Sequence, residues 1–451
     1  MASHGERSTS GNVRSPLPAD DDAPYPRRSY AWAVVAILIG TAILSYTDRQ
    51  VLSLLVDPIR RDLLISDTEV SLLLGTAFAV VYGVAGIPFG LLADRTSRRN
   101  LIFFGVVVWS IGTVACGFAG SFGGLFAARI VVGLGESVLS PSAISLISDY
   151  FPPSRGGLAV GSYLSGIAIG NGASILIGGG ALQLVEAGVF AGTPIALIAP
   201  WRLVLLVIGS PGLLWSLAIL AIREPERRAA IAPSASGAGG ASGRHAAVWR
   251  VAPIYLVVAT ASLVDNAVGA WAPTLLIRDF GRDAAQVGLQ LGLLLTIGFG
   301  GGVLLGGWLS DRLGSGGRWW RKLSVCLVSS LVILPVCWAI DAAQVRIVMA
   351  AVPLYFALSG IVTACGFSSI LDVVPSRQRG FAMGVSFFLN VALGAGLGPT
   401  SVALVSDRGF GSAAGLGPAI ALTAGAGFFL IATVLVLTLA TVKPRAAVSS
   451  P

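Results

Sequence analysis

The chain has 451 residues, of which 55% are hydrophobic and only 12% carry a formal charge. A soluble protein of this length would need more charge, so the composition predicts a polytopic helical membrane protein. The net charge of +8 comes from basic residues scattered through short segments, which argues against a nucleic-acid-binding surface.

Residues 1–29 predict a disordered tail, because they are polar, rich in proline and carry an acidic run. Two groups of six apolar segments follow, at 30–222 and 250–443, and each segment is long enough to cross a bilayer as a helix. Segment 223–249 joins the groups and has the Ala, Gly and Ser content of a flexible linker. Residues 444–451 form a second short tail. The expected spans are 30–56, 69–93, 100–119, 122–148, 157–181, 201–222, 250–276, 286–309, 321–340, 345–370, 379–403 and 414–441.

The distribution of lysine and arginine predicts how the spans are oriented. Segments on the side of the two termini carry about 21 basic residues, and segments on the other side carry about seven. We therefore expect both termini in the cytoplasm. The short loops and the lack of a sorting motif favour a bacterial inner membrane.

The first and fourth spans contain ionisable residues, although a charge at the bilayer centre costs about 2.5–3.5 kcal/mol. Arg129 and Glu136 lie seven residues apart, so they face nearly the same side of the fourth span. Asp48 lies in the first span. We predict that these three residues couple transport to protons, because protonation would release Arg129 or Glu136 from its partner. The alternatives are a purely structural ion pair and, for Asp48, a marker of the helix end.

The two halves of the chain repeat. GLLADR at 90–95 recurs as GWLSDR at 307–312, and Asp48 matches Asp265 at the same offset. DYFPPSRGGLAVG at 149–161 resembles DVVPSRQRGFAMG at 372–384. Internal repeats of this kind are typical of alternating-access transporters, whose substrate site lies between the halves.

The loop GLLADRTSRR and its second copy GGWLSDRLG resemble the signature loop of the major facilitator superfamily. The resemblance implies an all-α membrane fold of twelve helices in two pseudo-symmetric six-helix bundles. It also implies a charge cluster that latches the halves together on the cytoplasmic side. The match departs at Ser97, where the family usually has glycine, and a basic topology anchor is the alternative. The expected gating residues are Gly90, Asp94, Arg95, Arg98, Arg99, Asp149, Asp311, Arg312 and Asp372.

RIVVGLGES at 129–137 resembles the fourth-helix motif of proton-coupled members of that superfamily. Together with the first-helix pair Asp48 and Arg49 and the later SRGGLAVG, it resembles the Spinster-like branch. That branch implies a lysophospholipid or sphingoid-type amphiphile as cargo, moved with protons. The anion:cation symporter branch shares the first-helix motif, so small organic acids are the alternative cargo.

Polar residues inside the spans are candidates for lining a substrate cavity, because such residues face the interior of a helix bundle. Hydrogen bonding between helices is the alternative role for each of them. The run 319–322, with two tryptophans, an arginine and a lysine, is typical of an interfacial anchor instead. The cavity candidates are Tyr46, Arg49, Tyr82, Tyr163, Asn171, Asp265, Asn266 and Asn390.

The spans contain no metal-ligand spacing, nucleophile elbow or histidine, and the chain has no Walker A loop. We therefore predict a transporter rather than an enzyme or an ATP-driven pump. We expect no cofactor, no bound metal and no nucleic-acid partner. The expected partners are protons, a small-molecule or lipid-like substrate and the bilayer, with the chain acting as a monomer. A non-transporting membrane sensor is the alternative from another class.

Overall fold

The computed structural model describes residues 25–93, 95–225, 241–314, 319–374, 379–410 and 415–446. The described residues form helices and no strands, and they include twelve spans long and apolar enough to cross a membrane. This confirms the predicted fold class. Helices are the expected solution, because backbone groups in lipid must find their partners within their own segment. Four predicted features lie wholly or partly outside the described residues: the N-terminal tail (1–24), Asp94, the linker (226–240) and the C-terminal tail (447–451).

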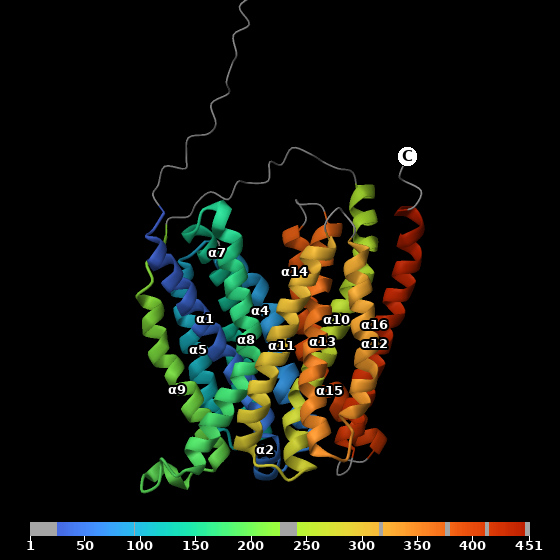
Figure 1. Cartoon of the computed structure of the whole chain (residues 1–451). Helices are drawn as coiled ribbons and strands as arrows, with labels where there is room; N and C mark the ends of the chain where they lie inside the picture. The colour runs from blue at the N-terminus through green and yellow to red at the C-terminus, as the bar shows by residue number, and fades with distance from the viewer. Residues whose placement is uncertain are drawn as a thin grey trace, which may run out of the picture.

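The helices stand roughly parallel in two lobes, one from each half of the chain (Figure 1). The N-terminal lobe contains α1 (Arg28–Gln50), η1 (Val51–Leu54), α2 (Val56–Leu63), α3 (Asp67–Ser71), η2 (Leu72–Thr76), α4 (Ala77–Ala93), α5 (Arg98–Phe118), α6 (Phe122–Glu136), α7 (Leu139–Tyr150), α8 (Pro153–Glu186), η3 (Pro194–Leu197) and α9 (Pro200–Leu220). The C-terminal lobe contains α10 (Ala241–Arg278), α11 (Ala284–Gly314), α12 (Trp320–Ala339), α13 (Val345–Val373), α14 (Arg379–Leu389), η5 (Asn390–Ala395), α15 (Gly396–Val405), η6 (Ser406–Phe410) and α16 (Leu416–Ala446).

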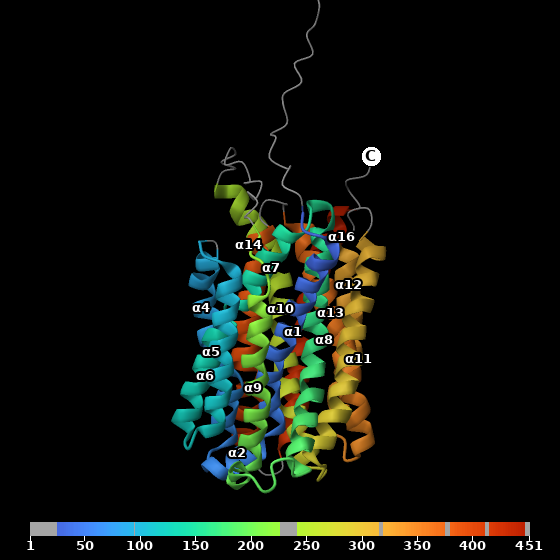
Figure 2. The same ribbon diagram turned by 90° about the vertical axis from the view of Figure 1, so that its left-hand side faces the viewer.

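The start of α1 and the end of α16 lie at one end of the bundle, and α2 lies at the other end (Figures 1 and 2). We call the first end the terminal side and the second end the α2 side. The lobes meet along α8 and α11, which pack against each other, and along the contact of η2 with α15.

Among the helix boundaries that differ from the sequence prediction, two matter most for the architecture. The fourth span is broken, because α6 ends at Glu136 and α7 begins at Leu139. Pro141 stands in the first turn of α7, where it has no N–H to continue a hydrogen-bond ladder from α6. In addition, α10 begins at Ala241 rather than at residue 250. The alanine content that indicated a flexible linker is also the composition that favours a helix.

Of the three π-helical turns in the described residues, two meet each other where the lobes touch. One is η2, between α3 and α4, and the other is η5, between α14 and α15. The hydroxyl of Thr76, in η2, donates to the carbonyl of Gly396 at 2.9 Å, directly after η5. The sequence gives no clear signal for these wide turns, which occur frequently at functional sites.

Candidate functional site

Glu136 forms a buried ion pair with Arg49. It is the last residue of α6 and only 1% exposed. Its Oε2 accepts hydrogen bonds from Arg49 Nε and from Ser45 Oγ, both at 2.6 Å. Ser45 and Arg49 are four residues apart, so they share one face of α1. Glu136 Oε1 is buried and accepts no hydrogen bond from any described residue. The carboxylate is therefore paired on one oxygen and unsatisfied on the other.

Three aromatic rings also hold the guanidinium of Arg49. Its Cζ lies 4.7 Å from the ring centroid of Tyr46, 4.2 Å from that of Phe78 and 5.1 Å from that of Tyr82. Each cation–π contact is worth about 0.5–2 kcal/mol, with the upper value where water is excluded. These rings keep the guanidinium in place even when its acidic partner is neutral. Phe78 was not among the predicted site residues, because a phenylalanine in a membrane span carries no sequence signal of function.

The pair lines a small hollow of about 20 Å³. Four of the predicted cavity residues meet there: Tyr46, Arg49, Tyr82 and Tyr163. The other lining residues are Ala42, Ser45, Glu136, Leu139, Ser140 and Ile167. This volume holds about one water molecule. An organic substrate therefore needs a more open arrangement of the same residues.

Arg129 binds backbone carbonyls, whereas a carboxylate partner was predicted. Its Nε donates to the carbonyl of Leu73 at 3.1 Å, and its Nη1 donates to the carbonyl of Asp48 at 3.3 Å. Its guanidinium thus binds backbone oxygens of η2 and α1 rather than a carboxylate, and Glu136 takes Arg49 as its partner. The Asp48 side chain is buried, 3% exposed. The two-turn separation of Arg129 and Glu136 along one helix, about 10 Å, is bridged by neither side chain.

The other predicted cavity residues lie outside the hollow. Asn171 accepts a hydrogen bond from Gln50 at 2.6 Å, which ties α8 to α1. Asn266 donates to the carbonyl of Ser262 within α10, and Ser262 Oγ donates to the carbonyl of Asn390 at 3.2 Å. These hydrogen bonds hold helices in place, which was the alternative role considered for the cavity candidates. Asp265, considered below, accepts hydrogen bonds from α13.

On the terminal side of the N-terminal lobe, Arg98 forms a buried charge network. It is 1% exposed and pairs with Asp149, and its Nε donates to Glu224 at 2.9 Å. Burial alone would raise the pKa of Glu224. The hydrogen bonds from the N–H of Arg99 and from the side chains of Arg98 and Ser97 nevertheless hold that pKa below its ordinary value. Glu224 was missed in the sequence because it lies in a polar segment after the sixth span.

The C-terminal lobe has a corresponding pair. Lys322 Nζ lies 2.6 Å from Asp372 and donates to Ser368 at 2.8 Å. Lys322 is only 5% exposed, so the prediction that it is an interfacial anchor is wrong. Its burial follows from its position in the first turn of α12, facing α13.

Three of the remaining gating candidates lie at the surface of the lobes. Arg95, Asp311 and Arg312 are exposed, and Arg312 stacks on Trp308 within α11. A side chain at Gly90 would meet nothing within 4 Å, so none of the described residues packs closely against this glycine. The charge pairs described on the terminal side thus connect helices of the same lobe.

Arg278 joins the two lobes on the α2 side. It is the last residue of α10, and its guanidinium lies 2.7 Å from Asp57 and 2.8 Å from Asp67 of the other lobe. Asp67 also pairs with Arg60 at 3.0 Å. The side chains of Arg278 and Asp57 are 14% exposed, and that of Asp67 is 1% exposed. We call this cluster the α2-side latch. In the sequence, its arginines indicated only the orientation of the spans.

Further contacts close the same side. Thr68 donates to Asp407 at 2.6 Å across the lobes, and Thr274 donates to the carbonyl of Ser53 at 3.1 Å. A Cβ atom on Gly179 of α8 would lie 2.7 Å from Gly288 of α11, so only glycine allows this crossing. Together with the latch, these contacts show the lobes sealed on the α2 side.

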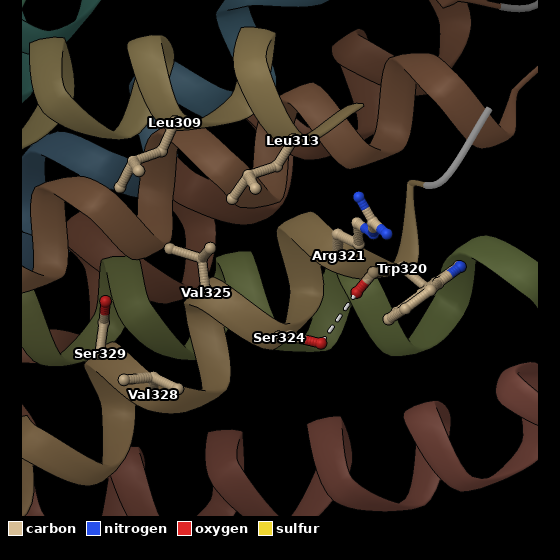
Figure 3. Close-up of a pocket in the computed structure, with 8 residues that line it drawn as sticks. All are labelled: Leu309, Leu313, Trp320, Arg321, Ser324, Val325, Val328 and Ser329. Atoms are coloured by element: carbon tan, nitrogen blue, oxygen red, sulfur yellow. Dashed lines mark hydrogen bonds between the residues drawn. The ribbon is translucent and has the colours of Figure 1, made fainter. Parts of the chain in front are cut away.

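A second hollow, of about 500 Å³, lies between α11 and α12 (Figure 3). Leu309 and Leu313 face Val325 across it, with Arg321 at one end. The other lining residues are Trp320, Ser324, Val328 and Ser329. It shares no residue with the hollow around Arg49. It lies within the C-terminal lobe and its lining is mostly apolar. It is therefore separate from the buried pair of Arg49 and Glu136 in the N-terminal lobe.

Twelve spans in two repeated lobes, with buried charges between the helices, define a secondary transporter of the alternating-access type. The profile of the Major Facilitator Superfamily matches residues 38–399, and the chain belongs to this family of membrane transporters.

Individual relatives agree with this assignment. An MFS-type efflux pump of Mycolicibacterium smegmatis is 29% identical over 400 residues, which cover 86% of each chain. The hexuronate transporter of Bacillus subtilis is 24% identical and covers 83% of this chain and 88% of its own. A solved bacterial homologue of the human lysosomal transporter Spinster, in an inward-facing and occupied conformation, superposes with a TM-score of 0.71. It is 27% identical and covers 92% of this chain and 96% of its own. The predicted Spinster-like resemblance is therefore confirmed, and the relatives are transporters rather than enzymes.

Proposed function

We propose that this chain is a proton-coupled symporter of an organic solute with an anionic group. Glu136 binds the proton, and Arg49 binds the anionic group of the substrate. The observation that carries the proposal is the buried pair itself, in which one oxygen of Glu136 is unsatisfied. Buried ion pairs are poor stabilisers compared with apolar packing. A transporter that keeps one inside the bundle has a use for it.

The coupling follows from competition for one guanidinium. While Glu136 is ionised, Arg49 is neutralised and has little affinity for a second anion. Protonation of Glu136 removes that charge, and the rings of Tyr46, Phe78 and Tyr82 hold the freed guanidinium in place. An anion then binds without displacing a competitor. Separating a buried pair costs about 3–5 kcal/mol, so a bound proton raises the affinity for the anion substantially. Proton and anion therefore travel together.

The remaining charges serve the change of conformation. Arg129 fixes α6 to the carbonyls of η2 and α1, so movement near Glu136 reaches the α2 side of the N-terminal lobe. Asp48, next to Arg49, completes the proposed coupling group. With the termini in the cytoplasm of a bacterial cell, the sealed α2 side faces outward and the present conformation is inward-facing. When the α2 side opens, the pairs around Arg98 and Lys322 exchange their contacts within lobes for contacts between lobes. The functional unit is one chain.

We favour a lysophospholipid or sphingoid-type amphiphile as cargo. The resemblance to the Spinster branch supports this, and apolar Leu139 and Ile167 lie beside the polar residues of the hollow. The second candidate is a sugar acid, which the hexuronate and D-galactonate transporters among the relatives favour. Both candidates give Arg49 an anionic group to bind, although a sphingoid does so only when it is phosphorylated.

Uptake into proteoliposomes tests the proposal. The probes are lysophosphatidylglycerol and D-glucuronate, with an uncharged monoacylglycerol as the control for the acyl chain. We expect Glu136→Gln to abolish uptake driven by a pH gradient while counterflow exchange continues. Glu186→Gln, at an exposed glutamate at the end of α8, is the matched control and should behave as wild type. Full pH-driven uptake by Glu136→Gln would refute the coupling mechanism.

A further inference from the structure

The C-terminal lobe holds a carboxyl group that this mechanism does not use. Asp265, in the middle of α10, accepts a hydrogen bond from Tyr355 at 2.9 Å. Ser359 Oγ lies 2.7 Å from both oxygens of the same carboxyl group. Tyr355 and Ser359 are four residues apart on α13, and both are fully buried. Their hydroxyls thus form one face that is turned toward Asp265.

No basic side chain of the described residues reaches this carboxyl group. Arg278, on the same helix, is thirteen residues away, about 20 Å along the axis, and is held by the α2-side latch. Lys322, at the start of α12, is held by Asp372. On α13 the arginine is Arg346, exposed at the helix start and more than two turns from Tyr355.

Among the described side chains, the other helices around α10 place no charge beside this carboxyl group. Asp311 and Arg312 lie at the terminal end of α11, and the spans of α15 and α16 contain no titratable residue up to Thr441. The described titratable groups near the carboxyl are the hydroxyl of Tyr355 and, behind it, the thiol of Cys337 on α12. Asp265 therefore differs from Glu136, whose charge is balanced by Arg49.

Hydroxyl partners suit a carboxyl group that changes its protonation state. An arginine can only donate hydrogen bonds, so it fits the ionised form alone. A hydroxyl group donates to a carboxylate and accepts from a protonated carboxyl. Tyr355 and Ser359 can therefore satisfy both forms of Asp265 by turning their O–H bonds. A buried carboxylate without a counter-charge is costly, and a proton removes that cost.

We infer that Asp265 is a second proton-binding site, in the C-terminal lobe and independent of the pair formed by Arg49 and Glu136. It stands at the position that matches Asp48 in the repeat. The two lobes thus bind protons by different means, one through an ion pair and the other through hydroxyl groups. A coupling role for this second proton rests on the proposed function, whereas the binding of the proton does not.

A pH titration followed by difference infrared spectroscopy tests the inference on the full chain in lipid nanodiscs, with no substrate added. We expect one component of the buried protonated-carboxyl band to disappear in Asp265→Asn and to persist in Glu136→Gln, which removes only the contribution of Glu136. Asp341→Asn, at an exposed aspartate of the same lobe, is the matched control and should keep the band. An unchanged band in folded Asp265→Asn would overturn the inference.

Ser359→Ala keeps the inference testable if Asp265→Asn does not fold. Ser359 bonds to both forms of the carboxyl group, but its bond to the ionised form is about twice as strong, so removing it raises the proton affinity about five- to tenfold. The midpoint of the band should therefore move about 0.7 to 1 pH unit toward higher pH. An unmoved midpoint would also overturn the inference. If this test succeeds while Glu136→Gln retains full pH-driven uptake, the proposed function fails and the second proton site stands.

Discussion

Removing Arg278 should open the α2 side of the transporter. Its guanidinium makes four hydrogen bonds, two to Asp57 and two to Asp67, and these two residues belong to the other lobe. All four must break before the lobes can separate on this side. In Arg278→Ala they are absent from the start, so the sealed conformation loses a stabilisation that the open one never had.

The size of the effect follows from the burial of the latch. Breaking a buried ion pair costs about 3–5 kcal/mol, and contact with water reduces this cost. Arg278 and Asp57 keep 14% of their side-chain surface exposed, and Asp67 still has Arg60 after the change. We therefore take the low end, about 3 kcal/mol, which shifts the equilibrium more than 100-fold. If the α2 side is open in about 1% of wild-type molecules, it should be open in about half of the variant.

Distances between spin labels would measure this shift. Cysteines at Arg61 and Arg282, both exposed, place one label on each lobe at the α2 side, and the four native cysteines are buried. Arg278→Ala should add a population with a longer distance. Arg346→Ala removes an exposed arginine from the same side and serves as the matched control. An unchanged distribution in a folded Arg278→Ala protein, or an equal change in the control, would refute the reasoning.

Two further predictions concern the terminal side and the contact between lobes. Glu224→Gln should lower the melting temperature at neutral pH by about 2 °C or more, because it breaks the ion pair with Arg98. Since the pKa of Glu224 is lowered in the folded protein, this stabilisation is complete above the ordinary value of 4.5 and is lost as pH falls through the folded value. The variant and the wild type should therefore converge in acid, and a difference that persists there would contradict the assignment. Gly179→Ala should push α8 away from Gly288 and lower thermal stability, whereas Gly180→Ala, with open space around it, should not. Equal melting temperatures for the two alanine variants would show that the crossing is not tight.

The fold was predictable because its main constraint, the length of the apolar segments, can be read directly along the sequence. Apolar segments of sufficient length must become helices in lipid, and the repeated loop at 90–95 and 307–312 indicates the duplication of six helices. The places where a span is interrupted were harder to predict. Pro141 ends the ladder after Glu136, but a proline near the start of a helix and one inside a helix look alike in sequence.

The residues of the candidate site could be predicted from the sequence, but the contacts between them could not. From the sequence we predicted Glu136 as a coupling residue and Arg49 as a cavity residue, and the structure places the two in contact. Which arginine reaches Glu136 depends on how α1 and α6 are rotated against each other, and periodicity along one helix does not contain that information. The same limit applies to Arg278, because its partners come from the other half of the chain.

The two π-helical turns give the seam between the lobes an unusual property. A π turn closes its hydrogen bonds over one residue more than the α-helical turns around it. Because η2 and η5 meet at the seam, a one-residue shift of either turn would change the bond between Thr76 and Gly396. It would also change which side chains face the partner lobe. Deleting one residue from either turn would restore an unbroken α-helix and fix the seam in a single geometry.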